Sequence, residues 1–211
     1  MVERATIKIG KLDAARRQLE TAVRLYFSEA DAVSIHTLVS AAYQVLSDVN
    51  KAHGGEPMLK EQIPTWVSPD ATAESKRLLN EAANFFKHAD RDHDEVLEFA
   101  EGPTGLLLYD AVRKYRELTG ENVPVLAVYD VWFWLGPGSH LVADAERGRT
   151  LADLRESFPH ATHASFFAEA LPVVTKRIGK AQNGCGQPFV GFTWIECRTG
   201  HAFDLSSMWI V

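Results

Sequence analysis

The sequence predicts an all-α protein, a helical bundle followed by a C-terminal tail that is either irregular or a short β-hairpin. Apolar residues recur at helical spacing in at least five segments of the chain. No part of the sequence shows the alternation of strands and helices that a parallel sheet requires. With 211 residues, of which 46% are hydrophobic, the chain is long enough to bury a core without disulfide bonds.

Two helices are expected near the N-terminus. Lys11–Glu29 carries one apolar stripe at helical spacing. The next helix has Asp31 or Ser34 as its capping residue and ends at the glycine pair Gly54-Gly55. Because few residues join the two helices, we expect an antiparallel hairpin.

The following region alternates loop and helix signals. Glu56–Val67 contains two prolines and is expected to be a loop. Ser68-Pro69-Asp70 combines a capping hydroxyl, a proline and an acid, which predicts the start of a third helix. This helix continues to Ala89 and meets the charged run Asp90–Asp94, and Glu95–Ala100 is a short element of undetermined type.

Two further helices are expected in the middle of the chain. Thr104–Leu118 has a helical apolar stripe and is followed by Gly120 as a stop signal. Val125–Leu135 is apolar nearly all round, which predicts a central buried helix, with a strand as the alternative. The aromatic residues within it are expected to pack in the core rather than to stack on bases.

The chain is expected to divide into three parts. Residues 1–136 form the main helical bundle, residues 150–180 add helices packed on it, and residues 181–211 form the tail. The additional helices are predicted at Leu151–Phe158 and Ser165–Lys180.

Composition limits the classes of function. The formal net charge of −6 argues against strong non-specific binding to DNA, which depends on neutralising phosphates. Two cysteines are too few for a disulfide framework. We expect no signal peptide, because Met1–Gly10 has no long apolar run, and the longest candidate membrane segment, Val123–Leu135, is too short to span a membrane. We therefore expect a cytoplasmic protein with no membrane partner.

Three stretches of the sequence resemble one family. They are KLDAARRQLETA from Lys11, VSIHTL from Val33 and NFFKHADRD from Asn84. Together they resemble a group of bacterial proteins that is similar to the HEPN helical domains. Those domains are small α-bundles, often dimeric, and many act in RNA cleavage, toxin–antitoxin pairs or phage defence. The resemblance implies a HEPN-like bundle that forms a homodimer, with RNA as a candidate partner.

The resemblance also implies a candidate site. HEPN nucleases carry an arginine, a polar residue, three further residues and a histidine. Asn84 and His88 match the polar residue and the histidine, and they are the candidate catalytic residues. Ala83 stands where the arginine is expected, so weak or absent nuclease activity follows, because no guanidinium would stabilise the phosphate there. Lys87 and Arg91 are candidate substrate-binding residues that would supply positive charge instead.

The same region supports an alternative function. Two imidazoles and several carboxylates within a few residues can ligate zinc, manganese or iron. The candidate ligands are His88, Asp90, Asp92 and His93, and a metal-dependent enzyme would be centred on His88, Asp92 and His93. No cofactor is required by the sequence, and a divalent metal is the one candidate. The alternative without chemistry is a solvated acidic turn.

Two further expectations concern packing. His36 lies between apolar residues of a predicted helix and is expected to be a buried core or interface histidine; the alternative is that His36 or His53 faces His88 from a neighbouring helix. The apolar excess of Val125–Leu135 and the aromatic stretch Phe189–Trp194 predict self-association, which leaves a purely structural dimerisation module as a further alternative.

Overall fold

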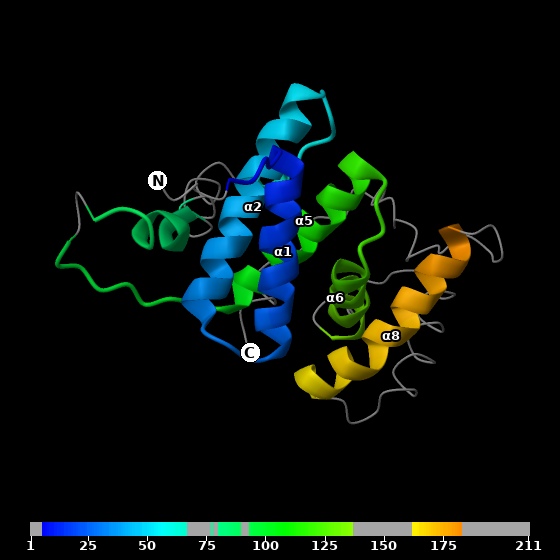
Figure 1. Cartoon of the computed structure of the whole chain (residues 1–211). Coiled ribbons are helices and arrows are strands. Elements are labelled where there is room, and N and C mark those ends of the chain that lie inside the picture. The colour runs from blue at the N-terminus through cyan, green and yellow to red at the C-terminus, as the bar shows by residue number, and fades with distance from the viewer. Residues whose placement is uncertain (1–5, 67–76, 78–79, 90–92, 137–161, 183–211) are drawn as a thin grey trace, which may run out of the picture.

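The computed structural model of the chain describes residues 6–66, 77, 80–89, 93–136 and 162–182. Within these residues the protein is mostly helical and contains no strand, which confirms the all-α fold class. The main helices keep the order of the chain and form one bundle (Figure 1). They are α1 (Lys11–Phe27), α2 (Ala32–Ala52), α3 (Leu59–Trp66), α5 (Gly102–Thr119), α6 (Pro124–Leu135) and α8 (His163–Gln182).

Helices α1 and α2 form the predicted hairpin and lie side by side (Figure 1). The carboxylate of Asp31 caps α2, since its Oδ2 accepts a hydrogen bond of 2.7 Å from the backbone N–H of Ser34. Gly54, just beyond the end of α2, has a φ of +66°, a conformation that glycine adopts without strain. The hairpin buries the apolar stripe of α1, including Leu19 and Val23.

Helix α3 corrects the sequence analysis, which predicted a loop over Glu56–Val67. Its first turn is held by two carboxylates: Glu61 accepts a hydrogen bond from the N–H of Met58, and Asp110 accepts one from the N–H of Leu59, both at 2.9 Å. Pro64 falls in the last turn, where it removes at most one backbone hydrogen bond. The prediction failed because Asp110 reaches this turn from α5, a contact that no local pattern reveals.

Helices α5 and α6 agree with the predictions. Helix α5 ends at Gly120, which has a left-handed φ of +68°. Helix α6 covers the predicted Val125–Leu135, so the strand alternative is wrong. It packs against α1, α5 and α8, and both Tyr129 and Phe133 are buried. Because α6 is covered within a single chain, its apolar character gives no argument for a dimer.

Helix α8 covers the predicted Ser165–Lys180 and continues across Pro172. It packs on α6 and α1 through residues that include Phe166 (Figure 1). The predicted helix Leu151–Phe158 and the tail over 181–211, apart from the end of α8, lie outside the described residues. None of the described helices combines the length and the apolar character needed to cross a membrane.

Residues 80–89 and 93–100 lie beside α2, on the side opposite α6 and α8 (Figure 1). Residues 80–85 are helical, and the chain then runs without regular structure through 93–100. Phe86 and Phe99 attach this segment to the bundle, since their rings contact each other and both contact His36 of α2. The expected start of this helix at Ser68-Pro69-Asp70 lies outside the described residues.

Candidate functional site

The candidate catalytic residues lie together at the end of the helical residues 80–85. Asn84 belongs to the last turn, and the backbone N–H of His88 still donates to the Asn84 carbonyl at 3.0 Å. The side chains of Asn84, Lys87 and His88 are all exposed. We call these three residues the exposed edge. Asn84 and His88 therefore lie one turn apart as expected, although the regular helix ends before His88.

Ala83, at the position where the HEPN pattern has an arginine, is buried, whereas its neighbour Asn84 is exposed. Its relative exposure is 7%, as is that of Ala82. A longer cationic side chain at this position would start from the buried face of the helix rather than from the exposed edge. The departure from the HEPN pattern is thus accompanied by a backbone position that turns inward.

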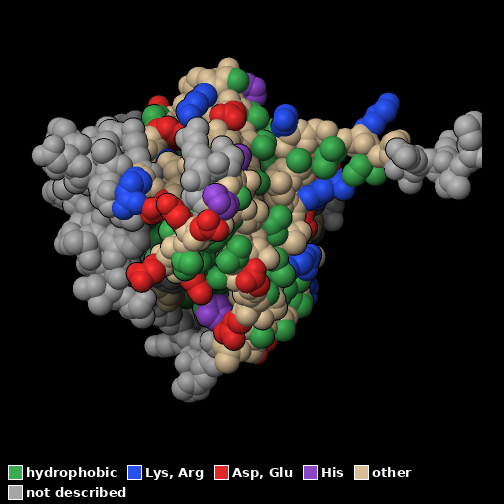
Figure 2. Space-filling view, turned by 90° about the vertical axis from the view of Figure 1, so that its left-hand side faces the viewer, with side chains coloured by type: hydrophobic (Ala, Val, Ile, Leu, Met, Phe, Trp, Pro, Cys, Tyr) green, Lys and Arg blue, Asp and Glu red, His purple; other side chains and the backbone are tan. Residues whose placement is uncertain are grey.

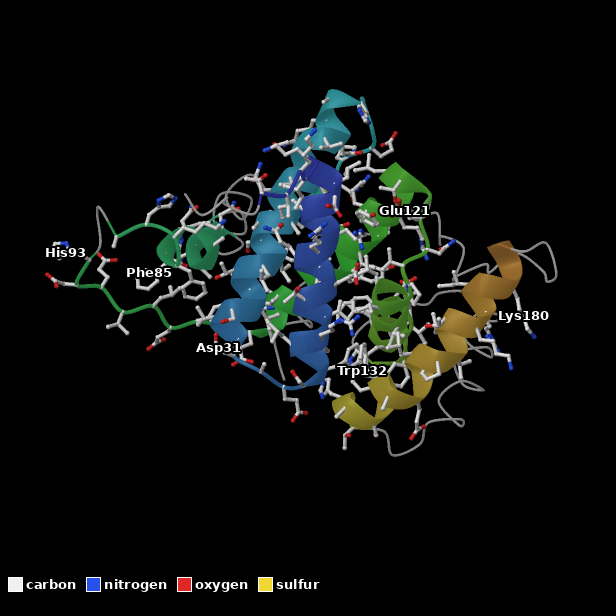
Figure 3. The ribbon with its side chains drawn as sticks, viewed as in Figure 1. Asp31, Phe85, His93, Glu121, Trp132 and Lys180 are labelled. Atoms are coloured by element: carbon white, nitrogen blue, oxygen red, sulfur yellow. The ribbon has the colours of Figure 1, made fainter. Side chains whose placement is uncertain are left out.

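The proposed metal ligands are only partly described. Asp90, Arg91 and Asp92 lie outside the described residues. His93 pairs with its neighbour Asp94, with 3.0 Å between Nε2 and Oδ2, and both side chains are highly exposed. Figure 3 shows His93 at the outer end of its segment, away from the bundle. Among the described residues no three histidine, cysteine or acidic side chains form a group that could hold a metal ion, so the metal site remains a prediction.

His36 lies beneath this segment and is buried, as predicted, with a relative exposure of 3%. Its Nδ1 is 2.8 Å from the hydroxyl oxygen of Thr104 on α5. The rings of Phe86 and Phe99 lie 5.8 and 5.2 Å from the imidazole, both edge-to-face. His36 of α2 therefore contacts α5 through Thr104 and the segments of residues 80–89 and 93–100 through Phe86 and Phe99.

The other ring nitrogen of His36, Nε2, is buried and has no hydrogen-bond partner among the described residues. Burial, and to a smaller extent the positive charges of Lys60 and Lys87, together lower the pKa of His36 to about 4. The imidazole is thus neutral at neutral pH, because charging it would require solvation that this position does not provide.

Lys60 of α3 is the group that sequence reasoning missed. Its Nζ donates a hydrogen bond of 3.0 Å to the side-chain oxygen of Asn80, and it lies 5.1 Å from the centroid of the Tyr43 ring. Burial, and then the charge of Lys87, lower the pKa of Lys60 to about 8. No signal in the sequence pointed to this lysine, because its neighbours come from α2 and from residues 80–87.

Below Lys60, a hydrogen-bonded network fixes the start of α3. The Tyr43 hydroxyl donates to Asp110 Oδ2 at 2.8 Å and accepts from the backbone N–H of Lys60 at 3.1 Å. The same Asp110 oxygen accepts from the N–H of Leu59. Burial and the nearby Asp110 carboxylate raise the pKa of Tyr43, so its phenol remains protonated and keeps donating. Lys60 is therefore attached to a backbone that α2 and α5 hold in place.

The surface around these residues is mixed in character. Figure 2 looks onto the side of the molecule that carries residues 80–89 and 93–100, where described acidic side chains gather over the middle and lower part of the face and basic side chains lie mainly toward its upper and right-hand edges.

Comparisons of the chain with protein-family models, with curated proteins and with solved structures give no match.

Proposed function

We propose that this protein is an RNA-associated helical module, similar to HEPN domains, with weak or absent nuclease activity. The observation that supports the proposal best is the exposed edge: Asn84, Lys87 and His88 point outward from one turn. The residue between them, Phe86, packs on the buried His36 and thereby attaches this turn to the bundle. An exposed polar group on an anchored backbone is what binding a polar ligand requires.

The residue types of the exposed edge suit an RNA backbone. A lysine ammonium binds phosphate as a point charge, and an amide or an imidazole can donate a hydrogen bond to a phosphate or ribose oxygen. A single exposed lysine in a protein of net charge −6 supports weak binding only. We therefore expect dissociation constants of the order of non-specific complexes, roughly 10⁻⁴–10⁻⁶ M, that increase with salt.

The same geometry favours binding over cleavage. RNA cleavage requires positive charge at the phosphate as negative charge develops in the transition state. The family supplies that charge from the position that Ala83 occupies here, and Ala83 is buried. Asn84 and His88 retain the ability to hydrogen-bond, whereas the guanidinium is missing from the pattern.

The experiment measures binding of a fluorescent single-stranded RNA to the full chain by anisotropy at low salt. We expect Lys87→Glu to weaken binding at least about threefold, because it removes one phosphate contact and adds repulsion. The matched control is Lys180→Glu near the end of α8, on the opposite side of the molecule (Figure 3). Equal weakening by both variants, or no binding by the original chain, would contradict the proposal.

Nuclease activity is tested on the same protein with the same RNA. We expect little or no cleavage product after a long incubation, and no difference between the original chain and His88→Ala. Efficient cleavage that His88→Ala abolishes would show that the chain is a nuclease without the family's arginine.

The proposal includes a homodimer, as the resemblance to HEPN domains implies. Static light scattering of the full chain at tens of micromolar tests it directly. A mass twice that of one chain is expected, and the mass of a single chain would overturn this part of the proposal while leaving RNA binding intact.

A further inference from the structure

Helix α8 carries three exposed cations and an exposed valine on one of its sides. They follow one another at intervals of three or four residues, so they share one side of the helix, which we call the basic flank: Val173, Lys176, Arg177 and Lys180. Val173 is 50% exposed, and residues 170–182 contain no acidic side chain. None of the three cations forms an ion pair among the described residues. The basic flank is therefore an apolar side chain surrounded by unpaired positive charge.

Negative charge gathers around another exposed valine, on residues 93–100. Four exposed residues there form what we call the acidic row: Asp94, Glu95, Val96 and Glu98. Val96 is 92% exposed, more than any other large apolar residue that the structure describes. Asp94 pairs with the neighbouring His93, whereas Glu95 and Glu98 form no ion pair within the described part of the chain. Figure 2 shows acidic side chains gathering on this face.

The acidic row and the basic flank lie at opposite ends of the molecule. Figure 3 labels His93, which adjoins the acidic row, at one end and Lys180, which belongs to the basic flank, at the other. The hairpin of α1 and α2 lies between them (Figure 1). One copy of the chain therefore cannot bring its own two surfaces together. Two copies can, because every copy carries both halves of a complementary contact.

We propose that the basic flank of one copy binds the acidic row of a second copy. Opposite charges fix the partner and its orientation, and contact between Val173 and Val96 removes two exposed apolar side chains from water. Because the surfaces lie at opposite ends, the contact is head-to-tail, and each added copy leaves one surface of each kind free. This association goes beyond RNA binding. It also differs from the proposed homodimer, which is closed at two copies.

The contact is expected to be weak. Exposed ion pairs contribute little, because solvent screens them and long side chains lose freedom when they pair. The net charge of −6 also makes two copies repel each other at long range. At about 0.1 M salt, charges more than about 10 Å apart are largely screened, so close pairs outlast the general repulsion. We therefore expect association at hundreds of micromolar, above the range that tests the homodimer.

Static light scattering of the full chain from tens to hundreds of micromolar tests the contact. At about 0.1 M salt we expect the apparent mass to keep rising with concentration. At about 1 M salt, where screening acts over about 3 Å, the rise should be lost. A mass that stays constant over this range, or that rises equally at both salt concentrations, would overturn the proposal. A single-chain mass at tens of micromolar would contradict the homodimer alone.

Two charge-reversed variants identify the surfaces. Lys176→Glu combined with Arg177→Glu reverses the basic flank, and Glu95→Lys combined with Glu98→Lys reverses the acidic row. Each variant alone should lose the rise in mass, since its two surfaces then carry the same sign of charge. An equimolar mixture should restore the rise, because each variant supplies the surface that the other requires. A mixture that does not associate would contradict the proposal, provided that both variants keep the circular dichroism spectrum of the original chain.

The matched control is Lys8→Glu combined with Lys11→Glu. Both lysines are exposed, at and just before the start of α1, and the change in net charge equals that of the variant with the reversed basic flank. This control should keep the rise in mass at about 0.1 M salt. If the control loses the rise as well, net charge rather than the basic flank governs the association, and the proposal is wrong.

Discussion

The two sides of the bundle are held together by different kinds of interaction. Where α1, α6 and α8 meet, aromatic rings fill the interface: the Phe27 centroid lies 6.1 Å from Phe166 and 4.9 Å from Phe167, and Trp132 lies 5.0 Å from Phe166. Figure 3 shows Trp132 at this junction. Packing between such rings depends mainly on buried area and ring geometry rather than on protonation.

The other side, where α2 meets α3, α5 and residues 80–89 and 93–100, depends on buried polar groups. His36 is bonded to Thr104, and Tyr43 is bonded to Asp110, in both cases at 2.8 Å. Buried polar groups of this kind cost free energy unless they are paired, and the pairing depends on protonation. The exposed edge of Asn84, Lys87 and His88 therefore lies on the side of the bundle where buried polar groups make stability depend on pH.

The largest expected loss of stability comes from a substitution in the aromatic interface between α1, α6 and α8. Phe166 has no exposed surface, so Phe166→Ala should lower the free energy of unfolding by about 3–5 kcal/mol. Urea denaturation measures it. The control is Val173→Ala on the same helix, where 50% of the residue is exposed and a change below about 0.5 kcal/mol is expected. Similar losses for both would mean that α8 is not held by its buried face.

Removing the Tyr43 hydroxyl, in the interface of buried polar groups, should lower the free energy of unfolding by a smaller amount. Tyr43→Phe leaves the Asp110 carboxylate without that donor and the Lys60 N–H without its acceptor, and should cost about 1.5–3 kcal/mol. A double-mutant cycle with Asp110→Asn checks the cause by urea denaturation. We expect the two losses to be strongly non-additive. Additive losses would show that the bond itself contributes little.

The stability of the folded protein should depend on pH through His36. Its folded pKa of about 4 is below the ordinary value of 6.5, so the unfolded chain binds a proton first as the pH falls. Stability from this source is complete above pH 6.5 and is lost as the pH falls toward 4, by about 2 kcal/mol between pH 7 and pH 5.

The measurement is urea denaturation of the original chain and of His36→Gln at both pH values. The variant should be less sensitive to pH in this range by the amount given. Proton NMR titration of the imidazole in the original chain provides a check that does not require the variant to fold. A His36 titration midpoint near the ordinary value would contradict the prediction.

The smallest expected effect concerns the exposed edge. His88 is exposed and has no role in packing, so His88→Ala should change the free energy of unfolding by less than about 0.5 kcal/mol. RNA binding, measured by anisotropy as above, should nevertheless weaken. A large loss of stability, with RNA binding unchanged, would assign His88 a structural role instead.

The sequence by itself determined the local features of the fold. The apolar stripes of α1, α2, α5, α6 and α8 are periodic, and the ends of these helices have local causes such as the Asp31 cap and the left-handed Gly120. The sequence also identified Asn84 and His88 as neighbours, because residues one helical turn apart meet whatever the rest of the fold does. Such features depend on a few adjacent residues, so a pattern can reveal them.

Only the tertiary structure decided which distant residues meet. Asp110 of α5 completes the start of α3, and Thr104 bonds His36 across the bundle. Lys60 acquired its lowered pKa from burial and from Lys87, which approach it only after folding. Periodicity records that a residue is buried but not which polar group it will face, since that depends on how whole helices pack. For this reason the sequence predicted the helical turn that carries Asn84, and missed both helix α3 and the polar surroundings of Lys60 on it.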